Sequence, residues 1–497
     1  MGCASARREQ WECVPALDAV TGRVGNSQTV GELLINKEST ETEGVGLVPI
    51  TMETEMTSKV VLPQICDVPY SDESIDSTYR KISWRLIPFI FLCYVMSFLD
   101  RINIGYAQLQ MKHDLGLSDA AYGLGAGIFF VGYLMFEVPS NLLLQKIGAR
   151  KTLFRIMFLW GITSVCTMFV TNHFQFFIVR FLLGIFEAGF FPGVILYLTY
   201  WYPGRRRSQI LALFMTGIVV AGLIAGPVSV GIMEAFNDVY GLRGWQWLFV
   251  LEGLPSTLLG IVALVYLTDR PSDARWLSPT QRAIVAHEVE NELRDVETGR
   301  TTKSTEVFRD FRVYFFALSL FAAVCGGYAI TFWLPLMIKG FGVTEPTQIG
   351  LYSMIPYALT GVVMVLWSRH SDRVMERRWH FALAAFAAAA GFILIPLSKD
   401  SFPLAMGALS LASAASISAL PVFWAMPTAY LSGKAAASGI AFINALATLG
   451  GVLSPWLIGT IKTMTGSQDN ALYAIAAVLV LGGVTVLVSV RAREAAH

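Results

Sequence analysis

The sequence predicts an all-α integral membrane protein, with twelve transmembrane helices in two six-helix bundles around a central cavity. Composition gives the first indication, because 54% of the 497 residues are hydrophobic and 15% are charged, against about 25% charged residues in soluble domains. Apolar segments recur from residue 85 onward, each near the ~20 residues that a helix needs to cross ~30 Å of hydrocarbon. A polar stretch at 268–312 separates six of these segments from the next six.

The limits of the expected spans follow the apolar segments in order. We place them at 85–107, 121–145, 153–171, 174–202, 209–233, 245–267, 313–338, 348–368, 380–397, 403–431, 435–461 and 470–490. The two groups of six resemble each other. A basic loop follows the second span (146–151) and the eighth (369–378), and a proline lies within the fourth (Pro192) and the tenth (Pro421). Two six-span repeats around a cavity are a recurring transporter plan.

Polar segments define the remaining domains. Residues 1–77 are rich in Glu, Thr, Ser and Val and lack a signal-peptide core, so we expect a disordered cytoplasmic tail, with Met52 and Met56 as other possible starts. Residues 78–267 form the N-terminal bundle, 268–312 a cytoplasmic linker, 313–491 the C-terminal bundle and 492–497 a short tail. Within the linker, Ser278-Pro279-Thr280-Gln281 has the pattern of a helix N-terminus, so we expect a short surface helix to Arg294.

The basic residues predict the orientation, because Lys and Arg concentrate in the cytoplasmic loops of membrane proteins. One set of loops and ends holds Arg80, Lys81, Lys146, Arg150, Lys151, Arg205, Arg206, Arg207, Arg369, Arg373, Arg377, Arg378, Lys434, Arg491 and Arg493. The opposite set holds little beyond Lys112, Arg243, Lys339 and Lys399. We therefore expect a multi-pass protein of the plasma (inner) membrane with both termini cytoplasmic.

Charged residues inside the first-half spans indicate transport. The spans between residues 84 and 268 contain Asp100, Arg101, Glu137, Arg180, Glu187 and Glu252, whereas charges in the second half lie only near the span ends. A charge at the centre of a membrane helix costs about 2.5–3.5 kcal/mol on insertion scales. This asymmetry favours a protein that handles an ion or a charged solute. The net charge of +1 gives no indication of nucleic-acid binding, and the six scattered cysteines lack metal-site spacing.

Several motifs carry a family resemblance over roughly residues 80–490. They are the stretches 98–103 (FLDRIN), 137–141 (EVPSN), 148–151 (GARK), 180–192 with Arg180, Gly184, Glu187 and Pro192, 244–255 with Trp245 and Glu252, 332–335 (FWLP), 371–373 (SDR), 421–427, and Gly439 with Asn444, Gly450 and Gly451. Together they resemble the major facilitator superfamily, within its anion:cation symporter branch, and the bacterial tartrate, hydroxyphenylacetate and sugar-acid permeases most of all. The resemblance implies import of a small carboxylate by proton symport and alternating access.

The chain departs from the family pattern at two places. The loop between the second and third spans has Asn141 and Gln145 where the superfamily usually has Gly and Asp. We therefore expect the charge contact of that loop to differ, while the second-half loop keeps Asp372 and Arg373. In the eleventh span Thr448 stands where relatives often have a second Asn, which we expect to affect substrate preference.

Arg101 is our first candidate for binding a substrate carboxylate. A guanidinium presents a planar fork of donors that matches a carboxylate and stays charged at every relevant pH. Its neighbour Asp100 points about 100° away on a helix, so the two cannot share one face. Asp100 is a candidate proton site, with a structural role as the alternative.

Arg180 and Glu187 lie seven residues apart, which places them on one helix face about 10 Å apart. Glu187 falls near the bilayer centre, where burial favours a carboxyl group that can take up and release a proton. We assign Glu187, Asp100 and Arg180 to proton coupling; a Glu187 carboxylate permanently bound by Arg180 or Arg101 is the alternative. The six histidines all fall in loops or at span ends, so we expect carboxylates to carry the proton.

The remaining candidates divide into two groups. We expect neutral second-half side chains to complete the central cavity: Tyr328, Thr331, Trp333, Tyr357, Trp424 and Asn444. We expect gating or structural roles for Glu137, Asn141, Arg150, Asp372, Arg373 and Glu252. Gly222 and Gly226 in the fifth span have the small-residue spacing that allows close helix approach.

The sequence favours a secondary active transporter that imports a small organic anion with protons, rather than an enzyme. The alternatives are an exporter of drugs or metabolites, a Na⁺-coupled anion carrier, a membrane enzyme and a solute sensor; the lack of a histidine within the spans disfavours the enzyme. We expect a monomer in the lipid bilayer, with the organic anion as its partner, the proton as coupling ion and neither a cofactor nor a metal.

Overall fold

The computed structural model describes residues 71–297, 306–431 and 433–489, all of which belong to one unit, Val68–His497. Helices and their connections make up these residues, and no β-strand occurs among them. Twelve helices or helix pairs in the described residues are long and apolar enough to cross a membrane. The prediction of an all-α membrane protein with twelve spans is therefore confirmed. Residues 1–70 of the predicted tail lie outside the described residues.

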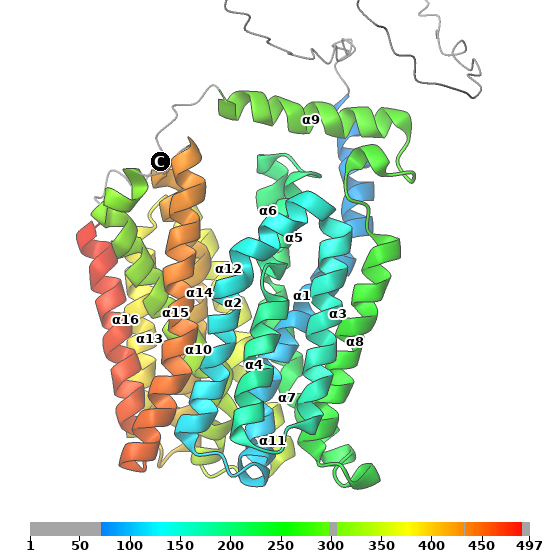
Figure 1. The fold of residues 1–497 in the computed structure, drawn as a ribbon. Coiled ribbons are helices and arrows are strands. Elements are labelled where there is room, and N and C mark those ends of the chain that lie inside the picture. Colours follow the sequence, from blue (N-terminus) through cyan, green and yellow to red (C-terminus); the bar gives the residue numbers. More distant parts are fainter. Residues whose placement is uncertain (1–70, 298–305, 432, 490–497) are drawn as a thin grey trace, which may run out of the picture. The chain divides into compact units, whose positions relative to one another are not determined.

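Eight α-helices make up most of the described part of the first half, and Figure 1 shows their arrangement. They are α1 (Asp72–Asp114), α2 (Asp119–Ile147), α3 (Ala149–Cys166), α4 (His173–Glu187), α5 (Phe190–Thr199), α6 (Gly204–Met215), α7 (Gly217–Ala235) and α8 (Gly244–Tyr266). Within this half α3 packs on α8, α2 on α4, and α1 on α7 and α8. These contacts place α1 between several neighbours, which matters because α1 carries Asp100 and Arg101.

Helix α1 begins earlier than the sequence indicates. Ser71 caps its N-terminus by accepting a hydrogen bond from the backbone amide of Ser74, and Asp72 and Glu73 in the first turn suit the helix dipole. Residues 72–77, which we expected in the tail, are therefore helical. At 43 residues the helix is about 65 Å long, well beyond the thickness of the hydrocarbon core.

The fourth span is interrupted directly after Glu187. Helix α4 ends at Glu187 and α5 begins at Phe190. Between them, Gly189 has φ = 87°, a left-handed conformation that glycine adopts without strain. We expected one continuous span over 174–202, with Pro192 as its irregular position. Pro192 lies instead in the first turn of α5, where a missing amide donor is tolerated.

The second half contains seven helices after a connecting helix. The connecting helix is α9 (Pro279–Glu297), and the others are α10 (Phe311–Gly340), α11 (Pro346–Tyr352), α12 (Met354–Val374), α13 (Arg378–Leu397), α14 (Phe402–Tyr430), α15 (Gly433–Thr465) and α16 (Asp469–Ser489). Helices α11 and α12 together form the eighth span. At the start of α9, Ser278 Oγ accepts from the amide of Gln281, and Gln281 Oε1 accepts from the amide of Ser278. This is the reciprocal capping pattern that the sequence indicates.

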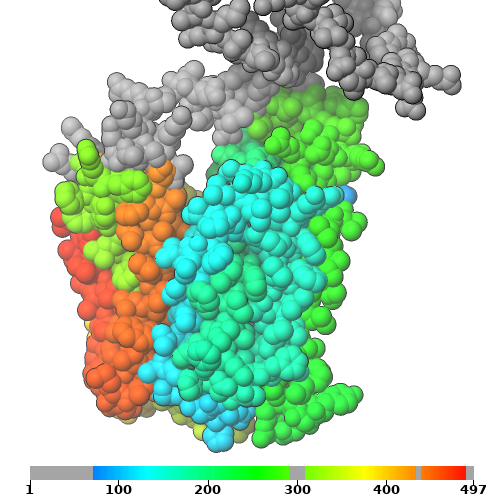
Figure 2. All heavy atoms as spheres, viewed as in Figure 1, coloured from blue at the N-terminus to red at the C-terminus, as the bar shows by residue number. Residues whose placement is uncertain are grey.

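The two halves meet along a few helix pairs. Helix α2 packs on α15, α7 on α11 and α12, and α1 on α10, and Figures 1 and 2 show α15 beside α2. We call the end of the helices that carries the loops 146–151 and 369–378 the basic end. The closest backbone contacts between the halves lie toward the opposite end. A Cβ on Gly105 would lie 2.9 Å from Thr331 O, and one on Gly127 would lie 2.6 Å from Val452 O.

Candidate functional site

The central feature of the first half is an ion pair between α1 and the end of α4. Arg101 donates through Nε and Nη2 to Glu187 Oε1, at 2.8 and 2.7 Å. Ser97, one turn before Arg101, donates its hydroxyl to the same oxygen at 2.7 Å. Glu187 is fully buried, and its Oε2 has no hydrogen-bond partner among the described residues. One carboxylate oxygen therefore receives three donors and the other receives none.

Aromatic rings surround the guanidinium of Arg101. Its Cζ lies 5.4 Å from the ring centroid of Phe98, 5.6 Å from Phe129 and 5.4 Å from Tyr133, within the range of cation–π attraction. Tyr328 of α10 also lies beside Arg101. Its ring centroid is 4.4 Å from that of Phe130 on α2. Arg101 thus faces the second half, and Tyr328 is the predicted second-half residue that the fold brings to it.

Arg180 is buried without a hydrogen-bonding partner. Its exposed fraction is 1%, and its Nε, Nη1 and Nη2 atoms lack acceptors among the described residues. The guanidinium lies 5.1 Å from the ring centroid of Phe129 and interacts electrostatically with Tyr122 and Glu187. A buried, unpaired charge is costly. Arg101 already binds Oε1 of Glu187. The cluster of Arg101, Arg180 and Glu187 therefore contains two cations for one carboxylate.

Asp100 points away from this cluster, toward α3. It accepts hydrogen bonds from Trp160 Nε1, from Ser164 Oγ at 2.8 Å and from Asn103 Nδ2 at 3.2 Å. Asp100 is 2% exposed. Three donors stabilise the charged form of a buried carboxyl group, an environment that also suits a structural role.

Glu252 on α8 is a second buried carboxyl group, close to Asp100. It is 3% exposed, and its Oε1 accepts from Ser229 Oγ at 2.9 Å. Its Oε2 has no hydrogen-bond partner among the described residues. Asp100 and Asn103 are its electrostatic neighbours. Glu252 therefore lies beside Asp100.

Glu137 and Asn444 connect the two halves. Asn444 Nδ2 on α15 donates to Glu137 Oε1 on α2 at 3.3 Å. One predicted substrate-site residue thus contacts one predicted gating residue. Asn141 donates its amide to the backbone oxygen of Glu137 at 2.9 Å, so it supports the same turn of α2.

The predicted loop residues lie at the basic end. The backbone amide of Arg150 donates to Asp269 Oδ1 at 2.8 Å, at the N-terminus of α3. Asp269, which follows α8, thereby supplies an acid to the loop that lacks the usual family aspartate. In the second half Asp372 forms an ion pair with Arg377, and Arg373 is exposed.

Three of the predicted second-half residues have contacts with groups other than Arg101. Trp333 is fully buried, packs edge-on against Tyr122 at 5.4 Å, and has Lys462 5.6 Å from its ring. Trp424 packs on a separate apolar cluster formed by α10, α13, α14, α15 and α16. The Thr331 hydroxyl bonds the Gly327 oxygen of its own helix at 2.9 Å.

Tyr357 fills the space over Gly222, where a Cβ would overlap its ring, and a Cβ on Gly226 would overlap the Gly350 oxygen. The two glycines thus allow the close helix approach that their spacing predicts.

Sequence reasoning missed the partners of the charged residues: Ser97, Asn103, Trp160, Ser164, Ser229 and Asp269. A signal existed for Ser97, because it lies four residues before Arg101 and so shares its helix face. Asn103, three residues after Asp100 on the same helix, offered a similar signal. Partners in other spans, such as Trp160, Ser164 and Ser229, gave no comparable indication.

Comparisons with known proteins agree with this architecture. The sequence model of the Major Facilitator Superfamily matches residues 90–495. The chain is 44% identical over 415 residues to an Agrobacterium vitis protein named "Putative tartrate transporter", covering 83% of this chain and 91% of that protein. It is 38% identical over 404 residues to the "Quinolone resistance transporter" of Acinetobacter baumannii, with 81% and 92% coverage.

Among solved structures, the crystal structure of a D-xylose-proton symporter superposes with a TM-score of 0.68 at 16% identity, covering 83% of this chain and 99% of that one. This likeness shows the shared fold. The extent of the sequence match and the twelve spans give the same assignment, a transporter rather than an enzyme. The chain belongs to the Major Facilitator Superfamily.

Proposed function

We propose that this protein imports a small organic carboxylate together with protons. The observation that carries the proposal is the ion pair of Arg101 with the fully buried Glu187. In this arrangement the donors best suited to a substrate carboxylate are occupied by a carboxylate of the protein itself. Substrate and Glu187 are therefore competitors for one guanidinium.

A proton resolves this competition. A proton on Glu187 removes the negative charge that attracts Arg101. Without that proton, breaking the buried ion pair costs about 3–5 kcal/mol. A substrate carboxylate that takes the place of Glu187 restores the pairing of Arg101. Binding of the anion is thus favoured by about 10²- to 10⁴-fold when a proton is already on Glu187, which makes the two bind together. That coupling is what symport requires.

Arg180 supplies the second attraction for an anion. Its guanidinium is buried and lacks an acceptor among the described residues, and it lies on the same helix face as Glu187, two turns away. A ligand with two acidic or hydroxyl-rich groups could satisfy both arginines. Tyr328 and Asn444 contribute neutral donors from the second half. The tartrate named for one 44% identical relative has this chemistry, with two carboxylates and two hydroxyl groups.

Alternating access follows from where the halves touch. The close contacts through Gly105, Gly123, Gly127 and Gly226 lie toward the end opposite the basic loops. We assign this conformation to the state that is sealed on the outer side, with the basic end on the cytoplasmic side of the plasma (inner) membrane. Substrate release to that side then completes import.

Export of a drug-like molecule is the second candidate, because the 38% identical relative is named for quinolone resistance. The aromatic surroundings of Arg101 also suit a planar aromatic acid. Direction of transport distinguishes the two functions.

The test uses purified protein in proteoliposomes. Labelled tartrate, gluconate, 4-hydroxyphenylacetate and a fluoroquinolone are supplied outside, with and without an inside-alkaline pH gradient, in sodium-free and sodium-containing buffer. We expect accumulation of a carboxylate that depends on the pH gradient and is abolished by a protonophore. Accumulation driven by sodium alone, or transport restricted to the fluoroquinolone, contradicts the proposal.

A further inference from the structure

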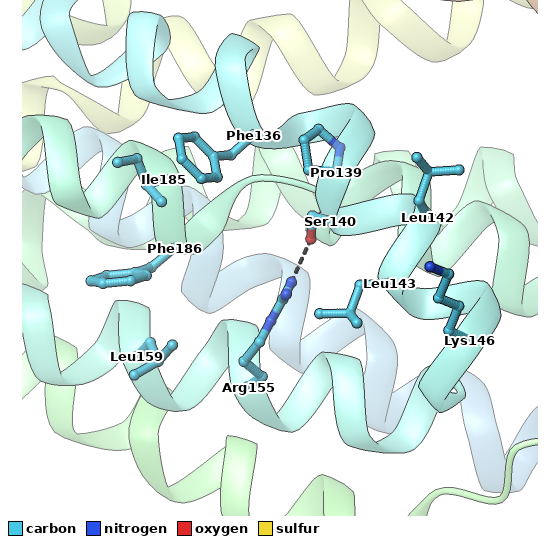
Figure 3. A pocket seen from close by; sticks show the side chains of 10 residues that line it. All are labelled: Phe136, Pro139, Ser140, Leu142, Leu143, Lys146, Arg155, Leu159, Ile185 and Phe186. Carbon is cyan, nitrogen blue, oxygen red and sulfur yellow. Dashed lines mark hydrogen bonds between the residues drawn. The ribbon is translucent and has the colours of Figure 1, made fainter.

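A groove of about 570 Å³ opens on the first half, and neither Arg101 nor Glu187 is among its lining residues. It lies between α2, α3 and α4 and is lined by Phe136, Pro139, Ser140, Leu142, Leu143, Lys146, Arg155, Leu159, Ile185 and Phe186 (Figure 3). Phe136 and Leu142 expose 39% and 55% of their surface, on spans whose outer faces meet lipid. The groove therefore opens toward the bilayer.

Two cations line this apolar groove. Arg155 reaches from α3 across the groove and donates through Nη2 to Ser140 Oγ at 2.5 Å (Figure 3). Lys146 lies at one end of the groove. The lining residues include no carboxylate. A guanidinium that faces lipid with a neutral hydroxyl as its hydrogen-bond acceptor is poorly compensated, so the groove favours an anionic occupant.

The order of the groups along the groove fits an amphiphile. Lys146 belongs to the last turn of α2, at the basic end. Arg155 lies six residues into α3, about 9 Å from that end, near the boundary of headgroups and acyl chains. Leu159 and Phe136 lie about 15 Å from the end, at acyl-chain depth. The groove thus presents positive charge at headgroup level and an apolar wall below it.

We propose that this groove binds one anionic phospholipid from the leaflet at the basic end, with its phosphate on Arg155 and Lys146 and an acyl chain along Phe136, Leu159 and Phe186. A small soluble anion would leave the apolar wall uncovered. A zwitterionic lipid would leave the two cations with a weaker net attraction. The transport substrate meets its own arginines elsewhere, so this site is separate from the one in the proposed function.

The site touches the break in the fourth span. Ser140, the acceptor of Arg155, lies directly against Gly189, where a Cβ would overlap its hydroxyl. Gly189 is two residues from Glu187. A phosphate that attracts Arg155 away from Ser140 changes the packing of Ser140 against Gly189. Lipid binding thereby affects the conformation of the fourth span beside Glu187.

The test measures lipid retention by native mass spectrometry on the full-length protein. The protein is delipidated in detergent and titrated with palmitoyl-oleoyl phosphatidylglycerol, with the phosphatidylcholine of the same chains, and with glycerol 3-phosphate. We expect one phosphatidylglycerol bound with at least tenfold preference over phosphatidylcholine and no retention of glycerol 3-phosphate. Equal retention of the two lipids, or retention of glycerol 3-phosphate, overturns the proposal.

Variants locate the site. Arg155→Gln should lose the preference for phosphatidylglycerol, and Arg155→Lys should keep most of it. Arg369→Gln, which removes an exposed cation at the basic end of α12, should bind as the wild type does. Leu159→Trp fills the groove without changing its charge, so this variant should also lose the lipid. It tests the site even if Arg155→Gln fails to fold. Unchanged preference in folded Arg155→Gln or Leu159→Trp places the lipid elsewhere and refutes the site.

Discussion

Arg101 and Ser97 both bond one oxygen of Glu187, and the other oxygen has no hydrogen-bond partner in the part of the chain that the structure describes. This asymmetry gives a proton a defined place to bind, because Oε2 is the oxygen whose lone pairs are unused. Protonation there adds a donor without displacing Ser97. The following predictions test this pair and the contacts that surround it.

Arg101→Lys keeps the charge but loses the fork of two donors. We expect apparent substrate affinity to fall about 10- to 100-fold, since hydrogen bonds to charged groups contribute about 1.5–3 kcal/mol each. Concentration-dependent uptake in proteoliposomes measures this change. The control is Arg243→Lys, an exposed arginine paired with Asp238, which should leave uptake unaltered. Wild-type affinity in Arg101→Lys would show that the fork does not bind the carboxylate.

Glu187→Gln imitates the protonated carboxyl group permanently. We expect substrate counterflow to persist and pH-driven accumulation to fail, because the empty carrier cannot release a proton it never gained. Counterflow and concentrative uptake are compared at several pH values, with the exposed Glu345→Gln as control. Accumulation that survives in Glu187→Gln moves the coupling role to Asp100 or another carboxyl group. Loss of both activities favours a structural role instead.

Asp100 and Glu252 should respond in opposite ways to removal of their charge. Asp100→Asn places an amide NH₂ among three hydrogen-bond donors, so we expect a loss of about 1.5–3 kcal/mol and a lower Tm. Glu252→Gln keeps the bond from Ser229 and removes a buried charge, so we expect an unchanged or higher Tm. Thermal unfolding of the purified variants decides between these outcomes, and the reverse ranking would contradict our assignment of the charges.

Gly226 and Gly231 offer a matched pair on α7. A Cβ on Gly226 would overlap the Gly350 oxygen, whereas one on Gly231 meets no atom within 4 Å. Gly226→Ala should therefore cost about 1–3 kcal/mol through overpacking and weaken the seal between the halves. Gly231→Ala should be neutral or stabilise the helix by up to about 1 kcal/mol. Tm and uptake measure both effects. Equal behaviour of the two variants would show that the close approach at Gly226 is unimportant.

The helical architecture could be predicted because it depends on composition along the chain. Long apolar segments have few alternatives to a membrane helix, and the Ser278–Gln281 cap is encoded locally. The break after Glu187 could not be predicted in the same way. Pro192 is the visible irregularity in that span, but the chain bends at Gly189, since proline is accommodated in a first helical turn.

The candidate site was predictable in its charges and not in their partners. Buried acids and arginines stand out in apolar spans, so Arg101, Arg180 and Glu187 could be named from the sequence. Which of them pair depends on how α1 and α4 rotate against each other, and this is set by packing across the whole half. The same limit applies to Trp333, which packs on Tyr122, because one aromatic residue in a membrane helix resembles another.

Helix α1 also contributes to the seal between the halves. Gln108 Nε2 donates to the Phe332 oxygen at 2.7 Å, and Gln108 follows Arg101 by seven residues, two turns along the same face, or about 10 Å. An intact helix is stiff over that length. A shift of Arg101 away from Glu187 therefore displaces Gln108 by a similar amount. The side chain that pairs with Glu187 and the side chain that joins α1 to α10 at the end opposite the basic loops thus move as one body.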